Sequence, residues 1–181
     1  MEIARLNKCV PLPIVEDEVV LDSMLGWLVR WLRILGVRAV YNSNFKDEEL
    51  LNIDHLLITR DRELFRKRTQ LSMLLETSRH LEWLSISSLV LGVPLVLDMG
   101  RSLCPICGSS LIKVGKDAVA DKVPKGVLSR YDDFWLCTGC GQVYWVGSHH
   151  MRIKKELELA RVLLGSISTS CVNNNLLIIR K

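Results

Sequence analysis

The sequence predicts an α/β fold in its first hundred residues, followed by a smaller cysteine-containing module. Short apolar segments alternate with amphipathic ones between residues 19 and 91, and two Cys-x-x-Cys pairs begin at 104 and 137. Strands that alternate with helices form a parallel sheet with helices on its faces. Of the 181 residues 49% are apolar and 24% charged, which excludes a disordered or collagen-like chain.

Hydrophobic periodicity sets the expected elements. The segment 23–36 is expected to be helical because apolar residues recur at steps of three and four, and Gly36 suits its end. The stretch 70–91 is ambiguous: it could be a strand and then a helix capped by Thr77 or Ser78, or helix throughout. The expected order is strand 19–21, helix 23–36, strand 38–41, helix 46–53, strand 56–59, a helix from 61, strand 70–75, a helix to about 91, linker 94–101, the cysteine module, helix 149–164, a turn-like or disordered stretch and a last edge strand within 176–181.

This order divides the chain into four parts. Residues 1–17, with two prolines and three acidic residues, are expected to be a poorly structured extension. An α/β domain (18–98), a cysteine module with a basic helix (99–165) and a C-terminal tail (166–181) follow.

Four of the six cysteines indicate a zinc site. Cys9 and Cys171 are isolated, whereas Cys104, Cys107, Cys137 and Cys140 form two pairs, each followed by glycine. The N-terminus has no secretory signal, so we expect a cytoplasmic protein, and a disulfide framework is the weaker interpretation. A redox pair is the other alternative, but two such pairs are typical of a tetrahedral Zn²⁺ site in a zinc ribbon. Four thiolates leave no open position, so the zinc is expected to be structural.

The charges are unevenly distributed along the chain. Residues 1–100 hold 12 basic and 14 acidic residues, a net charge of −2, and residues 101–181 hold 12 and 6, a net charge of +6. The second part therefore favours a polyanionic partner. No apolar run is long enough to cross a bilayer, so no membrane association is expected.

Three aspartates are expected at one edge of the sheet. Asp22 directly follows the first predicted strand, Asp61 follows the third after Thr59-Arg60, and Asp47 begins the helix between the second and third. Ligands of parallel sheets bind at the carboxyl ends of the strands. Clustered carboxylates favour Mg²⁺ or Mn²⁺, which can activate a water for phosphodiester cleavage. The alternative is that each aspartate caps a helix or is a solvated first-turn residue.

Several motifs in the same order resemble one known family. The stretches Leu21–Gly26 and Arg30–Gly36, the segment Asp47-Glu48-Glu49-Leu50, the strand ending Thr59-Arg60-Asp61, the two Cys-x-x-Cys pairs and the segment Tyr144–His149 are similar to the Mut-seven C-terminal RNase domain family. The resemblance covers roughly residues 18–160. It implies a PIN-like parallel sheet with flanking helices, followed by a small zinc ribbon.

The resemblance also implies an activity. It indicates a Mg²⁺- or Mn²⁺-dependent endoribonuclease with Asp22, Asp47 and Asp61 as the acidic site, acting in rRNA or tRNA processing by analogy. PIN domains often use a fourth acidic residue, for which Glu63 is the nearest candidate and Glu76 a distant second. The rival hypotheses are a non-catalytic RNA- or ribosome-binding protein and a zinc ribbon that contacts other proteins.

Basic and aromatic residues complete the expected RNA-binding site. Arginines near the carboxylates can clamp a phosphate, and the alternative is that they form surface ion pairs with nearby glutamates. Aromatic rings beside a basic helix suit single-stranded RNA, with ordinary packing and a solvated helix face as the alternative. The expected RNA contacts are Arg30, Arg33, Arg60, Tyr144, Trp145, His149, Lys154 and Lys155.

Overall fold

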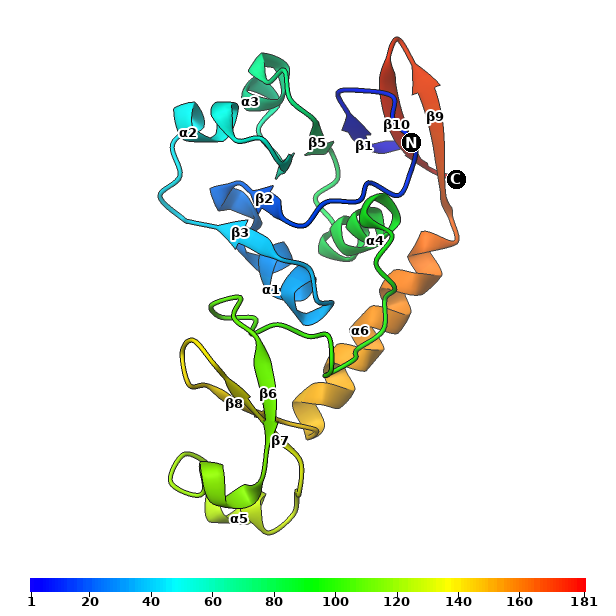
Figure 1. Cartoon of the computed structure of the whole chain (residues 1–181). Helices are drawn as coiled ribbons and strands as arrows, with labels where there is room; N and C mark the ends of the chain where they lie inside the picture. Colours follow the sequence, from blue (N-terminus) through cyan, green and yellow to red (C-terminus); the bar gives the residue numbers. More distant parts are fainter.

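Two β-sheets organise the computed structural model, which describes all 181 residues (Figure 1). The large sheet has the strand order β3-β2-β4-β5-β1-β10-β9, and the small one the order β6-β7-β8. The long helix α6 leads from the small sheet to the far edge of the large one (Figure 1). The predicted mixed α/β class, with a partly parallel sheet, flanking helices and a zinc-ribbon module, is confirmed.

The elements between residues 19 and 91 form close to their predicted positions, with strand 70–75 and helix 77–91 both present rather than one long helix. Helix 23–36 is divided into a 3-10 turn and α1. The elements are β1 (Glu2–Leu6), β2 (Val19–Leu21), η1 (Ser23–Leu25), α1 (Gly26–Ile34), β3 (Ala39–Tyr41), α2 (Asp47–Asn52), β4 (Leu56–Thr59), α3 (Arg62–Lys67), β5 (Ser72–Leu75), α4 (His80–Leu91), β6 (Leu111–Val114), η2 (Lys116–Val119), α5 (Lys125–Leu128), β7 (Phe134–Cys137), β8 (Val143–Trp145), α6 (Ser148–Leu164), β9 (Ile167–Val172) and β10 (Asn175–Arg180).

The parallel half of the sheet is buried on both faces. Strand β2 pairs in parallel with β3 and β4, and β4 with β5. Side chains alternate across the sheet: Leu21 joins the main core with α1 and α4, whereas Val20 packs with Leu50 of α2 and Leu64 of α3. Strands covered on both faces consist of continuous apolar residues, as the short strands here do.

The predicted N-terminal extension is wrong for its first residues. Residues 2–6 form β1, which lies between β5 and β10 and pairs with both in the antiparallel sense. Ile3, Ala4 and Leu6 are fully buried there. The error arose because one partner of β1 lies some 170 residues away in the sequence, where no local pattern can indicate the pairing.

The C-terminal tail is ordered as a hairpin, which corrects the expected turn-like or disordered stretch. Strands β9 and β10 pair through a turn in which Asn173 and Asn174 have φ of 50° and 63°, the left-handed conformation of tight hairpin turns. The interior strand is β10, and β9 forms the edge. Cys171 of β9 forms a disulfide with Cys9, so these two cysteines are not isolated.

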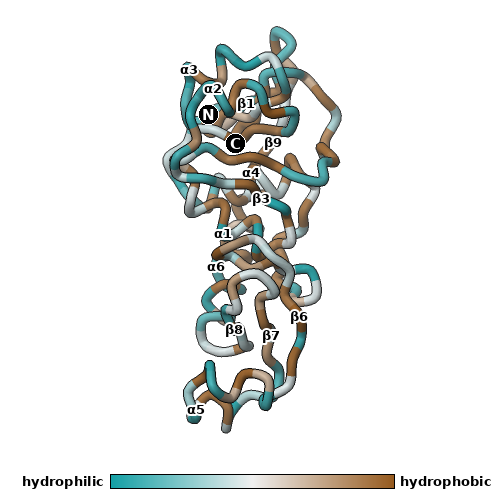
Figure 2. Tube along the Cα trace, turned by 60° about the vertical axis from the view of Figure 1, so that its left-hand side comes forward, coloured by the Kyte–Doolittle hydropathy of each residue, from teal (hydrophilic) through white to brown (hydrophobic).

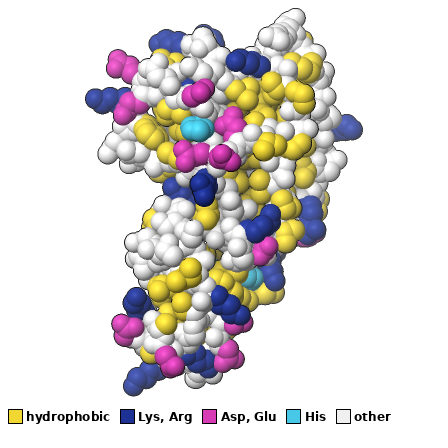
Figure 3. Space-filling view, viewed as in Figure 1, with side chains coloured by type: hydrophobic (Ala, Val, Ile, Leu, Met, Phe, Trp, Pro, Cys, Tyr) yellow, Lys and Arg dark blue, Asp and Glu magenta, His cyan; other side chains and the backbone are white.

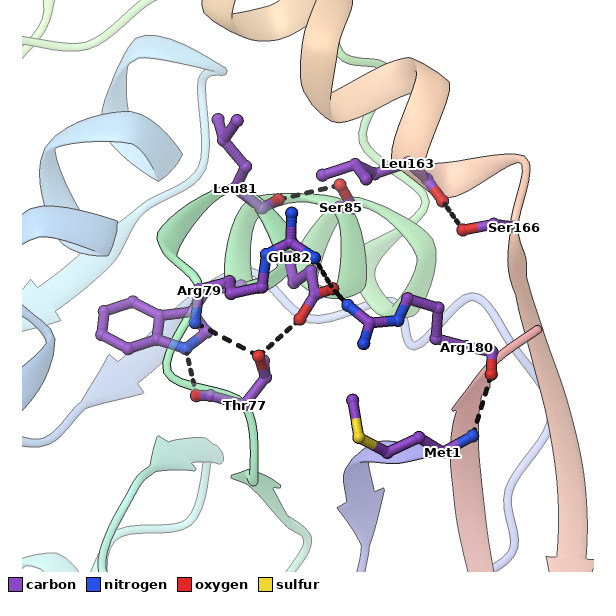
Figure 4. A network of polar contacts seen from close by, with 10 residues as sticks. Met1, Thr77, Arg79, Leu81, Glu82, Ser85, Leu163, Ser166 and Arg180 are labelled. Carbon is purple, nitrogen blue, oxygen red and sulfur yellow. Dashed lines mark hydrogen bonds and ion pairs between the residues drawn. The ribbon is translucent and has the colours of Figure 1, made fainter.

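A buried carboxylate fixes the terminal strands to α4 (Figure 4). Glu82 is 1% exposed, and its carboxylate forms ion pairs with Arg180 and Arg79 and accepts a hydrogen bond from the hydroxyl of Thr77. The amino group of Met1 in turn donates to the carbonyl of Arg180 at 2.9 Å. Both terminal strands therefore belong to the same packed unit as the parallel half.

The small sheet has a core of its own. Val119, Val123, Phe134 and Val143 are buried together, between the meander β6-β7-β8 and the short helices η2 and α5 of its insert. The molecule is narrower between the two sheets, near α1 and α6, than at the large sheet (Figure 2). None of the helices has both the length and the apolar character that crossing a membrane requires.

Candidate functional site

The four paired cysteines converge at one end of the small sheet. The sulfur atoms of Cys104, Cys107, Cys137 and Cys140 all lie within 4.8 Å of one another. Each pair forms a turn in which the glycine after the second cysteine donates to the carbonyl of the first, at 2.8 Å for Gly108 and 3.1 Å for Gly141. These glycines have φ of 80° and 73°, a conformation that residues with a Cβ rarely adopt.

The donor set fits a tetrahedral zinc ion. The sulfurs of Cys104 and Cys140 lie 3.7 Å apart, and those of Cys107 and Cys137 3.4 Å, close to the roughly 3.8 Å expected between ligands at zinc–sulfur distances of about 2.3 Å. Hydrogen bonds from Ser109 lower the pKa of the Cys107 thiol to about 6, which favours the thiolate that binds metal. A zinc ion held by all four sulfur atoms would be structural, because it would have no open position for a substrate.

Arg33 joins the zinc module to the large sheet and is not free to bind a phosphate. It is 9% exposed, and its guanidinium donates to the carbonyls of Ala39, at 3.0 and 3.1 Å, and of Ile106, at 2.9 Å. Burial lowers its pKa, and the thiols of Cys107 and Cys104 oppose that shift. The predicted RNA contact of Arg33 is therefore replaced by a positioning role: its side chain holds the first cysteine knuckle against α1 and β3.

Asp22 lies at the carboxyl end of β2 and is almost enclosed. It is 4% exposed, and its Oδ1 accepts from the backbone N–H of Met24 at 2.9 Å. Its Oδ2 accepts from the hydroxyl of Thr59 and from the backbone N–H of Arg60, the latter at 2.9 Å. Three donors thus hold the Asp22 carboxylate in place, and only Oδ1 keeps a lone pair free.

Asp61 lies beside Asp22 and is connected to it through Thr59. The hydroxyl of Thr59 accepts from the N–H of Asp61 at 2.9 Å while donating to Asp22. Oδ1 of Asp61 caps α3 by accepting from the N–H groups of Glu63 and Leu64, at 2.7 and 2.9 Å, and its Oδ2 accepts no hydrogen bond. The capping alternative is thus correct for Asp61, but it occupies only one oxygen.

Asp47 is the exposed first residue of α2, and its carboxylate accepts no hydrogen bond. The pKa of Lys67 is raised mainly by its hydrogen bond and charge pairing with Glu63, and further by the charges of Asp47 and Asp61. Both aspartates therefore lie near the Lys67 ammonium.

The three aspartates share the predicted sheet edge but do not enclose a common point. The cysteines are the only set of three or more His, Cys, Asp or Glu side chains whose ligand atoms all lie within 4.8 Å of one another. The free oxygens of Asp22, Asp47 and Asp61 have the hard-ligand chemistry of a Mg²⁺ or Mn²⁺ site. Binding one ion would require these side chains to move together.

A family model described as the Mut7-C RNAse domain matches residues 17–157. The chain belongs to this family. The matched range contains the parallel half of the large sheet, all four zinc ligands and most of α6, whereas β1, β9 and β10 lie outside it. No curated protein and no solved structure matches the chain significantly.

Neither candidate for a fourth acidic residue of the RNase domain is unpaired. Glu63 is exposed and bonds to Lys67 at 2.7 Å. Glu76, which follows β5 at the same edge, pairs with Arg62 at 2.6 Å and Arg5 at 3.1 Å.

Arg60 and an aromatic cluster lie next to Asp22. The guanidinium of Arg60 lies 5.1 Å above the ring of Trp83, and its Nε is buried without a hydrogen-bond partner. His80 stacks on Trp27 with ring centroids 4.9 Å apart and contacts Trp83 at 4.4 Å. The sequence did not indicate Trp83 or His80, because both lie in the stretch whose secondary structure was ambiguous. Arg30 is exposed on α1 and forms no ion pair.

The predicted RNA contacts of the small module differ in accessibility. Tyr144 is partly buried, and its hydroxyl lies 3.1 Å from the sulfur of Cys104; burial raises its pKa. Trp145 packs partly against the module's core, whereas His149, Lys154 and Lys155 are exposed on α6.

Acidic side chains gather on the large-sheet part of the molecule (Figure 3). At the amino end of β4, His55 lies 3.9 Å from Glu16 and 3.8 Å from Glu18. This group lies at the sheet edge opposite to Asp22 and Asp61, which makes neighbouring Asp54 a suitable control residue.

Proposed function

We propose that this chain is a Mg²⁺- or Mn²⁺-dependent endoribonuclease whose acidic site consists of Asp22, Asp47 and Asp61. Membership of an RNase domain family supports a nuclease function in general. The observation that carries the specific proposal is the juxtaposition of Asp22 and Asp61, joined through Thr59 at the carboxyl edge of the parallel sheet.

The residues at this edge have distinct roles in the proposed reaction. A bound divalent cation supplies water activation and charge neutralisation for phosphodiester hydrolysis. The hydroxyl of Thr59 and the N–H of Arg60 orient the carboxylate of Asp22. Asp61 and Asp47 offer oxygens that no protein group occupies. Arg60, between Thr59 and Asp61, and Arg30, exposed on α1, are the residues that would bind the phosphates on either side of the scissile bond.

The substrate proposed is RNA, with ribosomal or transfer RNA processing in the cytoplasm as the setting. The net charge of +6 after residue 100 supports a polyanionic substrate. The exposed basic residues of α6 provide a surface for it, continuous with the zinc module.

Cleavage of labelled total RNA in Mn²⁺ tests the proposal. Asp22→Asn and Asp61→Asn each remove an anionic ligand, so both should lose at least about 100-fold in rate, which corresponds to about 2.7 kcal/mol. Asp54→Asn removes the same charge at the opposite edge and should cut at the wild-type rate. Equal rates for all three variants would show that the activity does not depend on this edge.

Two observations favour a second candidate, a non-catalytic RNA-binding protein. Asp22 is nearly enclosed by three donors, and every candidate for a fourth acid is paired. A wild-type protein that binds RNA but does not cut it in Mg²⁺ or Mn²⁺ would support this candidate.

A further inference from the structure

A hollow lies where the two parts of the molecule meet. It is open to solvent and has about 480 Å³ of empty space, open solvent at its mouth included, and eight of its twelve lining residues are hydrophobic. The end of α1, the linker, the first zinc knuckle, β8 and the start of α6 all contribute, through Ile34, Leu97, Pro105, Tyr144, His149 and His150. The predicted RNA contacts Tyr144, Trp145 and His149 thus line one cavity, which no sequence pattern indicated.

His150 provides an unsatisfied polar group in this apolar hollow. It is 8% exposed and forms no hydrogen bond with the rest of the protein. Burial, together with the nearby charge of Lys154, lowers its pKa, so the ring is neutral at pH 7 and has one donor and one acceptor. Because the ring has no hydrogen-bond partner within the protein, its donor and its acceptor are available to a ligand that enters the hollow.

The mouth of the hollow also suits an anion. Helix α6 has 17 residues and begins without a side-chain cap, because its N-cap residue is Gly147. The backbone N–H groups of Ser148, His149 and His150 have no acceptor in the protein. The start of a helix carries partial positive charge, and Lys154 adds a full one nearby.

We propose that this hollow binds one nucleotide unit of single-stranded RNA, with the base between the apolar walls and the phosphate at the first turn of α6. The inference rests on the proposed function in that the ligand is RNA. A planar base with donors and acceptors on its edge matches an apolar slot that holds one neutral imidazole. An aliphatic ligand would use the walls but would leave His150 and the anion site without partners.

The position of the hollow relates it to the acidic edge. Ile34 at the hollow and Gly26 near Asp22 are the two ends of α1, whose nine residues span about 14 Å. Arg30, exposed between them, lines a groove with Tyr41 and Ile106 that follows α1. A single RNA strand of several nucleotides can therefore occupy the hollow and reach Asp22.

Binding of an uncleavable strand tests this site without turnover. The probe is a fluorescein-labelled 2′-O-methyl 12-mer of mixed sequence, titrated into the zinc-loaded full chain. His150→Leu removes the polar edge and Ile153→Trp fills the hollow, so each should weaken binding about tenfold, as loss of one stacked base does. His55→Leu, a histidine that does not line the hollow, should bind like wild type. Unchanged affinity in both hollow variants would overturn the proposal.

Crosslinking locates the base directly and remains informative if a variant fails to fold. A 4-thiouridine strand irradiated on the wild-type protein should attach to the peptide that contains Tyr144 to His150. Attachment only to other segments would overturn the site. Titration with nucleoside monophosphates separates the two sources of a nucleotide: affinity equal to that of the strand would assign the hollow to a free nucleotide and overturn the RNA assignment.

These measurements separate this site from the proposed activity. If cleavage depends on Asp22 but the His150→Leu variant binds the strand as tightly as wild type, the proposed function stands and the proposed site in the hollow is wrong. If the protein does not cut RNA but crosslinks to the strand through the hollow, the site stands and the proposed nuclease function is wrong.

Discussion

Residues that carry a charge serve two distinct purposes in this chain, and burial separates them. Arg33 and Arg30 lie one helical turn apart on α1, yet Arg33 is buried against backbone carbonyls of two segments and Arg30 is exposed without a partner. The first holds the structure together, whereas the second is available to a ligand. The same contrast separates Glu82, which fixes the terminal strands, from Asp47, which has no partner.

Replacing each of these two arginines with alanine should reveal the difference. Arg33→Ala leaves the buried carbonyls of Ala39 and Ile106 without donors, so it should lower the free energy of unfolding by about 2–3 kcal/mol. Arg30→Ala should change it by less than about 0.5 kcal/mol, while weakening RNA binding. Urea denaturation measures the free energy of unfolding of both variants, and equal losses of stability would contradict the role given to Arg33.

Elements differ in how far the sequence alone could identify them. The zinc ligands could be predicted because each pair lies within four residues, so the spacing itself encodes the turn. The parallel strands were predictable from their short apolar runs. Strand β1 and the pairing of Cys9 with Cys171 were not, because their partners are distant in sequence. The role of Arg33 and the hollow around His150 were hidden for the same reason, since both require surfaces from several elements.

The basic residues on α6 predict how strongly RNA binding should depend on salt. Each phosphate of a single strand that a protein neutralises adds about −0.7 to the slope of log K against log salt. Replacing Lys154 and Lys155 with alanine should therefore flatten that slope by about 1.4, without abolishing cleavage of a short substrate. Lys122 and Lys125, exposed in the insert of the small module, are the matched control pair. An unchanged slope would place the RNA path elsewhere.

In the molecule as a whole, helix α6 connects two separate cores, because it follows the small sheet and its Leu157 and Ala160 pack in the core of the large one. The zinc module has its own buried cluster around Phe134, and the large sheet has a separate one. The division at residues 98 and 165 remains a prediction that metal removal can test.

Removing the metal should unfold one part and leave the other. Cys107→Ser, or a strong chelator, deprives the small core of the tetrahedral site that closes it. Trp135 and Trp145 report on that module, and Trp27, Trp31 and Trp83 on the large sheet. One variant keeps only Trp135 and Trp145, and its fluorescence should change when the metal is chelated. The other variant keeps only Trp27, Trp31 and Trp83, and its fluorescence should stay nearly constant. A simultaneous change in both would contradict the division.

The central position of β1 has a consequence for how the chain acquires its structure. Its partner β5 follows it by about 70 residues, but its other partner β10 follows by about 170 residues, so β1 is synthesised long before both of its edges can be paired. Contacts of such sequence separation slow folding because a large loop must close before they form. Until then the apolar face of β1 is exposed to other nascent chains. The edge of β1 that pairs with β10 therefore stays unpaired until the chain between these two strands has been made.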